Sequence, residues 1–189
     1  MKLIDQLRTA VRANRLANHR LHGALTRLDP AEFQASRTSF FPSLAATLNH
    51  LLAVDGYYLD ALQGEPEMAA RFHRFVPCAD VAELAARQRA SDERLIRHVD
   101  ALTDAGLNAS VVMDRGDSRQ VDAAGHVLAH LLMHQTHHRG QAHAMLSSTS
   151  VPPPQLDEFL MPSDAPQRAD DMRQLGWEER DLFARTPAA

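Results

Sequence analysis

The chain has 189 residues, a length that suits one domain with a substantial hydrophobic core. Apolar residues make up 44% of the sequence and charged residues 23%, which are ordinary values for a globular protein, and the low count of 8 glycines favours helix. The net charge of −4, with Lys2 as the only lysine, argues against a broad cationic surface, so we expect no nucleic-acid partner.

The cysteine content and the hydropathy pattern indicate a reducing compartment and no membrane. Cys78 is the single cysteine, which excludes an intramolecular disulfide and a cysteine-based zinc site within one chain. Residues 1–14 carry interspersed charges, unlike a signal peptide, and no run approaches the roughly 18 apolar residues of a membrane span. We therefore expect a cytoplasmic protein that does not bind membranes.

Four long segments show apolar residues at three- and four-residue intervals, the spacing of amphipathic helices. The predicted helices cover residues 3–28, 44–62, 81–102 and 123–148. Ser43, Asp80 and Asp122 are the expected N-caps of the last three, because their side chains can accept hydrogen bonds from the first free N–H groups.

The segments between these helices carry weaker signals. Asp29-Pro30 predicts a helical turn over residues 31–35, and residues 64–79 have the pattern of a connecting segment. Residues 110–121 change to an extended pattern with Gly116 at the turn, which predicts a hairpin. A Ser- and Pro-rich loop at 147–154 precedes a short peripheral helix over 167–184.

These elements predict an all-α fold, a four-helix bundle with a small hairpin insertion before the fourth long helix. There is no alternation of strands and helices that would indicate a parallel sheet. We expect residues 1–189 to form one domain, with 163–189 as a peripheral extension.

The fourth predicted helix is rich in histidine. His126, His130, His134 and His138 follow at intervals of four, and each step advances only about 40° around a helix, so the four side chains form one stripe. Several buried imidazoles on one face would need several acceptors, which this helix lacks. The stripe therefore predicts a metal site, although His126 lies about 18 Å from His138 along the axis, too far to join it.

A helix alone cannot complete such a site, so a further ligand must come from a neighbouring helix. His50 is the best candidate, because it lies within an apolar helix where an unpartnered imidazole would be poorly placed. The alternative for His50 alone is a core histidine hydrogen-bonded to a neighbour.

Other catalytic motifs are absent from the sequence. His134 is followed by Gln135 where a zinc protease helix would have glutamate as the general base, which disfavours peptide hydrolysis. No Gly-x-Ser-x-Gly elbow or glycine-rich phosphate loop occurs. Metal chemistry is the remaining enzymatic option.

Residues 134–141, His-Gln-Thr-His-His-Arg-Gly-Gln, resemble the His-x-x-x-His-Arg-Gly-Gln signature of the DinB-like or YfiT-like metalloproteins, a group of bacterial four-helix-bundle proteins. The resemblance extends to 14–21 with its paired asparagines, to Leu48-Asn49-His50, and to 153–160. It implies that His134 and His138 are two metal ligands and His50 the third. It also implies that His137 does not bind the ion, while His130 is a reserve ligand or a supporting residue one turn earlier.

The resemblance implies a divalent metal ion such as zinc or nickel, and three imidazoles also suit iron or copper. It further implies a possible homodimer, and a metal- and thiol-dependent transferase acting on a small-molecule substrate with a low-molecular-weight thiol. A hydrolase is the other enzymatic option, because the ion would also acidify a bound water. The alternative is a non-catalytic, metal-stabilised module for ligand binding or stress response.

Three further residues are candidates for supporting roles. Asp55 and Arg139 suit hydrogen bonding to the ligands or charge pairing with a substrate, and a surface role for Asp55 is the alternative. Cys78 is a poor internal nucleophile, because nothing in its neighbourhood places a base beside it.

Overall fold

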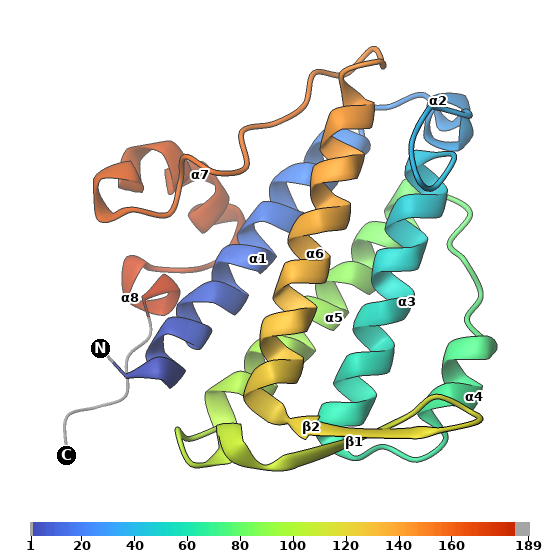
Figure 1. Cartoon of the computed structure of the whole chain (residues 1–189). Helices are drawn as coiled ribbons and strands as arrows, with labels where there is room; N and C mark the ends of the chain where they lie inside the picture. The colour runs from blue at the N-terminus through green and yellow to red at the C-terminus, as the bar shows by residue number, and fades with distance from the viewer. Residues whose placement is uncertain (1, 184–189) are drawn as a thin grey trace.

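The computed structural model describes residues 2–183, and most of them are helical (Figure 1). Four helices in this part of the chain have 20 residues or more, and the expected all-α character is confirmed. They are α1 (Leu3–Leu25), α3 (Leu44–Gln63), α5 (Val81–Ala101) and α6 (Ala124–Leu146). Helices α1 and α3 each pack against both α5 and α6, so every long helix has two long neighbours.

Two of the long helices begin at the predicted caps. The Ser43 hydroxyl accepts a hydrogen bond of 3.1 Å from the Ala46 N–H at the start of α3. The Asp80 carboxylate accepts one of 2.8 Å from the Glu83 N–H at the start of α5. Both side chains satisfy N–H groups that have no partner within the helix, which fixes where each helix begins.

The predicted hairpin is present and is slightly longer than expected. Strand β1 (Ser110–Asp114) pairs antiparallel with β2 (Arg119–Ala123), and Gly116 has a φ of 92° in the turn. The hairpin crosses the lower ends of α6 and α3 in Figure 1. Tyr57 of α3 donates a hydrogen bond of 2.7 Å to the Asp114 carbonyl, which ties the hairpin to the helices.

The predicted N-cap of α6 is wrong. Asp122 is part of strand β2, and Ala123 occupies the cap position without a side-chain hydrogen bond. The Ala124 N–H donates instead to the Ala109 carbonyl at 2.9 Å. Backbone pairing therefore continues to the first residue of the helix and replaces the expected carboxylate cap.

The segment predicted as a simple connection contains a short helix, α4 (Met68–His73). Helix α3 ends at Gly64 with a φ of 67°, and Glu67 also has a positive φ of 58° just before α4. Met68 is buried in the core cluster and the Phe72 ring lies 5.8 Å from the Tyr57 ring. Six residues are too few for a helical period to be recognised, so only tertiary packing reveals this helix.

The C-terminal segment forms two helices, where one was predicted over 167–184. Helix α7 (Ala165–Leu175) ends at Gly176, whose left-handed φ of 68° terminates the helix. A second helix, α8 (Glu179–Leu182), follows. Residue 184 lies outside the described residues. Both helices contact α1, through a separate apolar cluster that includes Leu16.

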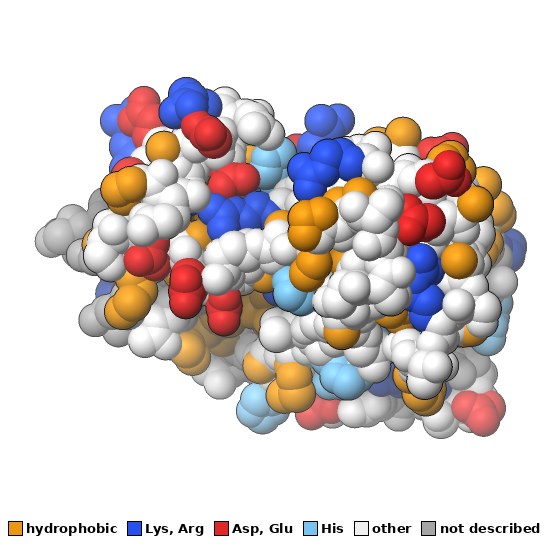
Figure 2. Space-filling model, turned by 90° about the horizontal axis from the view of Figure 1, so that it is seen from above, with side chains coloured by type: hydrophobic (Ala, Val, Ile, Leu, Met, Phe, Trp, Pro, Cys, Tyr) orange, Lys and Arg blue, Asp and Glu red, His pale blue; other side chains and the backbone are white. Residues whose placement is uncertain are grey.

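The remaining elements are short. They are α2 (Pro30–Gln34), a 3-10 turn η1 (Gly106–Asn108) and a 3-10 turn η2 (Pro162–Asp164). Within residues 2–183, no helix has both the length and the apolar character needed to cross a bilayer. Acidic and basic side chains are interspersed on the face shown in Figure 2, in keeping with the small net charge.

Candidate metal centre

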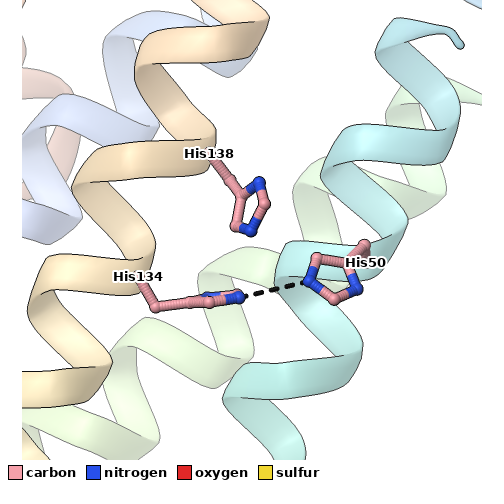
Figure 3. A group of neighbouring side chains, drawn as sticks. All are labelled: His50, His134 and His138. Atoms are coloured by element: carbon pink, nitrogen blue, oxygen red, sulfur yellow. Dashed lines mark hydrogen bonds between the residues drawn. The ribbon is translucent and has the colours of Figure 1, made fainter. Parts of the chain in front are cut away.

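Three histidines from two helices come together between α3 and α6 (Figure 3). His50 comes from α3, and His134 and His138 come from successive turns of α6. One ring nitrogen of each side chain lies within 4.8 Å of those of the other two, close enough to hold one metal ion. Among the described residues this is the one group of three or more His, Cys, Asp or Glu side chains with such geometry.

The helical spacing explains how the group forms. His134 and His138 are four residues apart, so both side chains leave α6 on the side that packs against α3. Their ring centroids are 4.4 Å apart, and the His50 ring lies 4.7 Å from that of His138. The Nε2 atoms of His50 and His134 face each other at 3.2 Å.

Burial keeps all three imidazoles uncharged at neutral pH. Desolvation is the main cause that lowers the pKa of His50, His134 and His138, and repulsion from neighbouring histidines adds to it. The pKa of His134 falls to about 4. Neutral rings retain a lone pair, which is the form in which histidine binds a metal.

The donor set fits a divalent cation. Two nitrogens bound at about 2.1 Å in tetrahedral geometry lie roughly 3.4 Å apart, close to the separation of the His50 and His134 Nε2 atoms. The other nitrogen of His134, Nδ1, is buried and has no hydrogen-bond partner among the described residues. Among the described residues the ring therefore has one hydrogen-bond partner, His50, and a cation between the two Nε2 atoms would take the place of that contact.

Gln141 fixes the orientation of His138. The His138 Nδ1–H donates to the Gln141 Oε1 at 2.8 Å, which leaves the Nε2 lone pair free for a metal. The amide nitrogen of Gln141 is 3.2 Å from His137 Nε2, so the same side chain also holds the neighbouring ring. Sequence reasoning gave Gln141 no role, although its position three residues after His138 on one helix face was a usable signal.

Phe41 covers one side of the histidine group. Its ring centroid lies 4.4 Å from that of His50 and 5.6 Å from that of His138. Phe40 packs edge-on against Phe41 at 4.9 Å and is itself 81% exposed. Both residues precede α3, and no local sequence pattern indicates the contact of Phe41 with the histidines.

A cavity of about 270 Å³ adjoins the histidine group and is lined by His134. Its walls include Tyr57, Tyr58 and Phe72, and the Arg115 guanidinium lies 5.1 Å from the Tyr57 ring centroid. Arg115 also donates to the Tyr58 hydroxyl at 3.4 Å. The hairpin thus brings a positive charge to an aromatic cavity beside the candidate ligands.

The comparison with known families agrees with the histidine motif. A family model described as the DinB family matches residues 4–176. The chain belongs to the DinB family. No protein in a search of curated proteins matches it.

The other histidines of α6 stand outside the group in this DinB-family chain. The His130 ring lies 6.4 Å from that of His134 and packs against Tyr58, and it lines the adjoining cavity. His126 is exposed near the start of the helix, and the exposed His137 contacts Gln141. Neither His130 nor His126 belongs to the group of three.

Asp55 and Arg139 lie on the core side of their helices, away from the histidine group. Asp55 is 2% exposed and accepts hydrogen bonds from Gln88 at 2.8 Å and from Gln135, so the surface role considered for it is wrong. Arg139 is buried and donates to the side chains of Asn14 at 2.5 Å and Asn18 at 3.0 Å. Its guanidinium is therefore engaged inside the protein.

These residues belong to a buried polar network behind the histidines. Asn18 donates to Asp92 at 2.9 Å, and Gln88 joins Asp92 to Asp55. Desolvation raises the pKa of Asp55 well above its usual range and that of Asp92 to about 6. The network links all four long helices at the level of the candidate site.

Cys78 does not have the surroundings of a nucleophile. The side chain is buried and burial raises the pKa of its thiol, the opposite of what a thiolate requires. Asn49 holds the backbone on both sides, accepting from the Cys78 N–H at 2.7 Å and donating to its carbonyl at 3.0 Å. This contact anchors the loop before α5 against the helix that carries His50.

Proposed function

We propose that His50, His134 and His138 bind one divalent metal ion and that the protein uses it to act on a small molecule. The reaction class we favour is a transfer in which a thiol attacks the small molecule. The alternative is a hydrolysis in which water takes the place of the thiol. The observation that carries the proposal is the convergence of three neutral imidazoles within 4.8 Å, with no fourth His, Cys, Asp or Glu in the group among the described residues. Three protein ligands and an open position are typical of catalytic metal sites, whereas structural sites are closed.

The fold supports this proposal. The packing of α1 and α3 against both α5 and α6 is what a four-helix bundle requires, and bundles build metal sites from side chains on facing helices. The family match over residues 4–176 supports one domain that includes both ligand-bearing helices. The homodimer and the cytoplasmic location expected from the sequence stay predictions.

We favour zinc or nickel as the ion, because neutral imidazoles suit both, with iron or copper as alternatives. When bound, such an ion would supply Lewis acidity that makes a thiol or water at its open position a better nucleophile at neutral pH.

The residues around the histidines have roles in this proposal. Gln141 would hold His138 in the tautomer that presents Nε2, and Phe41 would limit the access of water to the group. Tyr58 and Arg115 would orient a substrate with an apolar body and a negatively charged or electron-rich group in the adjoining cavity. His130 lines that cavity and offers a ring nitrogen as a proton acceptor.

Elemental analysis of protein purified without an affinity tag tests the metal site. We expect about one divalent ion per chain in the native protein and its loss in His134→Ala. His126→Ala is the matched control, since His126 is an exposed histidine of the same helix outside the group. A native protein that neither carries nor binds metal at micromolar concentration, or His134→Ala protein that retains it, would refute the site.

A second measurement tests the catalytic role. Metal-loaded protein is mixed with glutathione as a model thiol and with chlorodinitrobenzene as a chromogenic electrophile. Turnover that depends on the metal and on His134 supports the transferase. A metal that admits no exchangeable water, together with no turnover, supports instead the non-catalytic, metal-stabilised binding module.

A further inference from the structure

A second cavity, of about 520 Å³, lies between α1, the first half of α5 and the segment that ends α7. None of the residues that line it belongs to α3 or α6, the helices that carry the histidine group. Arg15 and His22 of α1 contribute buried polar side chains to it, and Trp177 stands at the C-terminal side. The cavity is thus separate from the candidate metal centre.

Arg15 is a buried cation that has no partner among residues 2–183. It is only 6% exposed, yet it makes no hydrogen bond and no ion pair within 4.0 Å to any described residue. Asp92 and Glu93 attract the Arg15 charge by long-range electrostatics, without a hydrogen bond to its guanidinium. The Asp92 carboxylate is already occupied by Asn18 and by Gln88.

The other buried arginines show that this is unusual for the protein. Arg12 forms hydrogen bonds to Asp100, Arg139 to two asparagines, and Arg168 to two carbonyls and a glutamate. Buried charges are as a rule paired, because an unpaired charge loses its hydration without compensation. Arg15 alone among the buried arginines of the described chain lacks that compensation.

The His22 ring, which lines the same cavity, also lacks a partner in the described part of the chain. The ring is 7% exposed and forms no hydrogen bond to a described residue. Burial and then the charge of Arg15 lower its pKa to about 3, so the ring is neutral and offers one N–H donor. Four buried polar atoms of the described chain are sealed from solvent without a partner, and none belongs to Arg15 or His22. The free nitrogens of both side chains therefore reach the cavity surface.

Small and apolar side chains form about half of the cavity wall, and polar or charged side chains form the rest. Ala82, Ala85 and Ala86 leave space along α5. Leu175 at the end of α7 and Trp177 just after it line the opposite side. Apolar walls with a few convergent polar groups are the usual composition of a small-molecule site. The exposed Glu93 and Arg89 also line the cavity and carry opposite charges, which leaves Arg15 as the uncompensated charge among the lining residues and favours a ligand with one negative charge.

We propose that this cavity binds a small organic monocarboxylate. The carboxylate accepts two parallel hydrogen bonds from the Arg15 guanidinium and one from His22. The apolar part of the ligand lies between the alanines of α5 and Trp177. Occupation supplies the counter-charge that Arg15 lacks, and the site is independent of the metal.

Trp177 provides the assay, since it is the only tryptophan of the chain. Its fluorescence is followed during titration with phenylacetate, and separately with the neutral phenylacetamide and with inorganic phosphate. We expect saturable binding of phenylacetate, with affinity at least about tenfold higher than for the amide or for phosphate.

Two variants and a matched control define the site. Arg15→Gln removes the charge and should weaken phenylacetate binding by about tenfold or more. Ala86→Leu fills the cavity from an exposed helix position and should abolish binding, whereas Ala90→Leu, one turn later and outside the cavity, should bind like the native chain. Circular dichroism verifies that each variant is folded.

Three outcomes would overturn the inference. They are absence of saturable binding, equal affinity for phenylacetate and phenylacetamide, and native affinity in either Arg15→Gln or Ala86→Leu. Phosphate binding that depends on Arg15 without phenylacetate binding would also overturn it, in favour of an inorganic anion site. Titration of His134→Ala keeps this test apart from the proposed metal function, because binding should persist there.

Discussion

Replacing Gln141 by leucine should weaken metal binding without removing a ligand. The leucine retains the size of the side chain and removes the oxygen that accepts the His138 Nδ1–H at 2.8 Å. Without that acceptor the His138 ring can rotate or carry its proton on Nε2, the atom that would bind the ion. The amide contact to His137 at 3.2 Å is lost as well.

The size of the effect follows from the role of such a partner. Removing a hydrogen-bond acceptor behind a metal-binding histidine typically costs 10- to 100-fold in affinity, or about 1.4–2.7 kcal/mol. Competition titration of zinc against a chromogenic chelator measures this directly. Gln141→Glu retains the acceptor and adds a negative charge, so we expect its affinity to equal or exceed that of the native protein.

His137→Ala separates the two contacts of Gln141, because it removes the neighbouring ring and leaves the His138 contact intact. Its zinc affinity should stay within about threefold of the native value. A Gln141→Leu protein that binds zinc as tightly as the native chain would refute the role of Gln141. So would an equal loss in Gln141→Leu and His137→Ala, because that result would assign the effect to His137.

Four further predictions concern stability. Zinc at about 100 times its dissociation constant should stabilise the native chain by roughly 2.7 kcal/mol and leave His134→Ala unchanged, as read from thermal unfolding. Tyr57→Phe removes the 2.7 Å hydrogen bond to the Asp114 carbonyl and should cost about 1 kcal/mol in urea denaturation. Arg168→Leu removes a fully buried guanidinium bound to the Phe159 carbonyl at 2.7 Å, which should cost about 3 kcal/mol and expose the segment after α6 to proteases. Burial raises the pKa of Asp92 in the folded protein to about 6, above its ordinary value of 3.8. Its stabilising contribution is therefore complete below about pH 3.8 and is lost as the pH rises through about 6. Asp92→Asn should therefore gain on the order of 3 kcal/mol relative to the native chain between about pH 4 and pH 8, and parallel pH profiles would contradict this.

The long helices were predictable because their signals are local. Apolar periodicity over 20 or more residues and the caps Ser43 and Asp80 define elements that the structure reproduces. The prediction for Asp122 was wrong because its side chain is of the type that caps helices, whereas the residue pairs with Val111 in the hairpin. Helix α4 was missed because its position depends on the burial of Met68, which only the tertiary structure determines.

Some residues of the candidate site were predictable from local sequence patterns, and others were not. The spacing of His134 and His138 is a property of one helix, and His50 stood out as a polar residue in an apolar context. Phe41 and Arg115 reach the site from a loop and a hairpin, whose positions relative to the helices no local pattern encodes. The lack of a partner for Arg15 within residues 2–183 likewise becomes visible only in the tertiary structure.

The register of α6 connects the buried network to the histidine group. Gln135 and Arg139 follow His134 and His138 by one residue each, a rotation of about 100° around the helix. The histidines therefore face α3 while the next residues enter the core, where Arg139 bonds Asn14 and Asn18.

On α3, Asp55 lies five residues after His50, about 140° around the helix, so it too points into the core. Its carboxylate accepts a hydrogen bond from Gln135 of α6. Rotating either helix enough to separate the three imidazoles would break buried hydrogen bonds to charged groups, each worth about 1.5–3 kcal/mol. The polar core behind the site thus fixes the angles at which α3 and α6 present their histidines. This gives buried Asp55 and Arg139, which contact none of the three, a physical part in the geometry of the candidate metal centre.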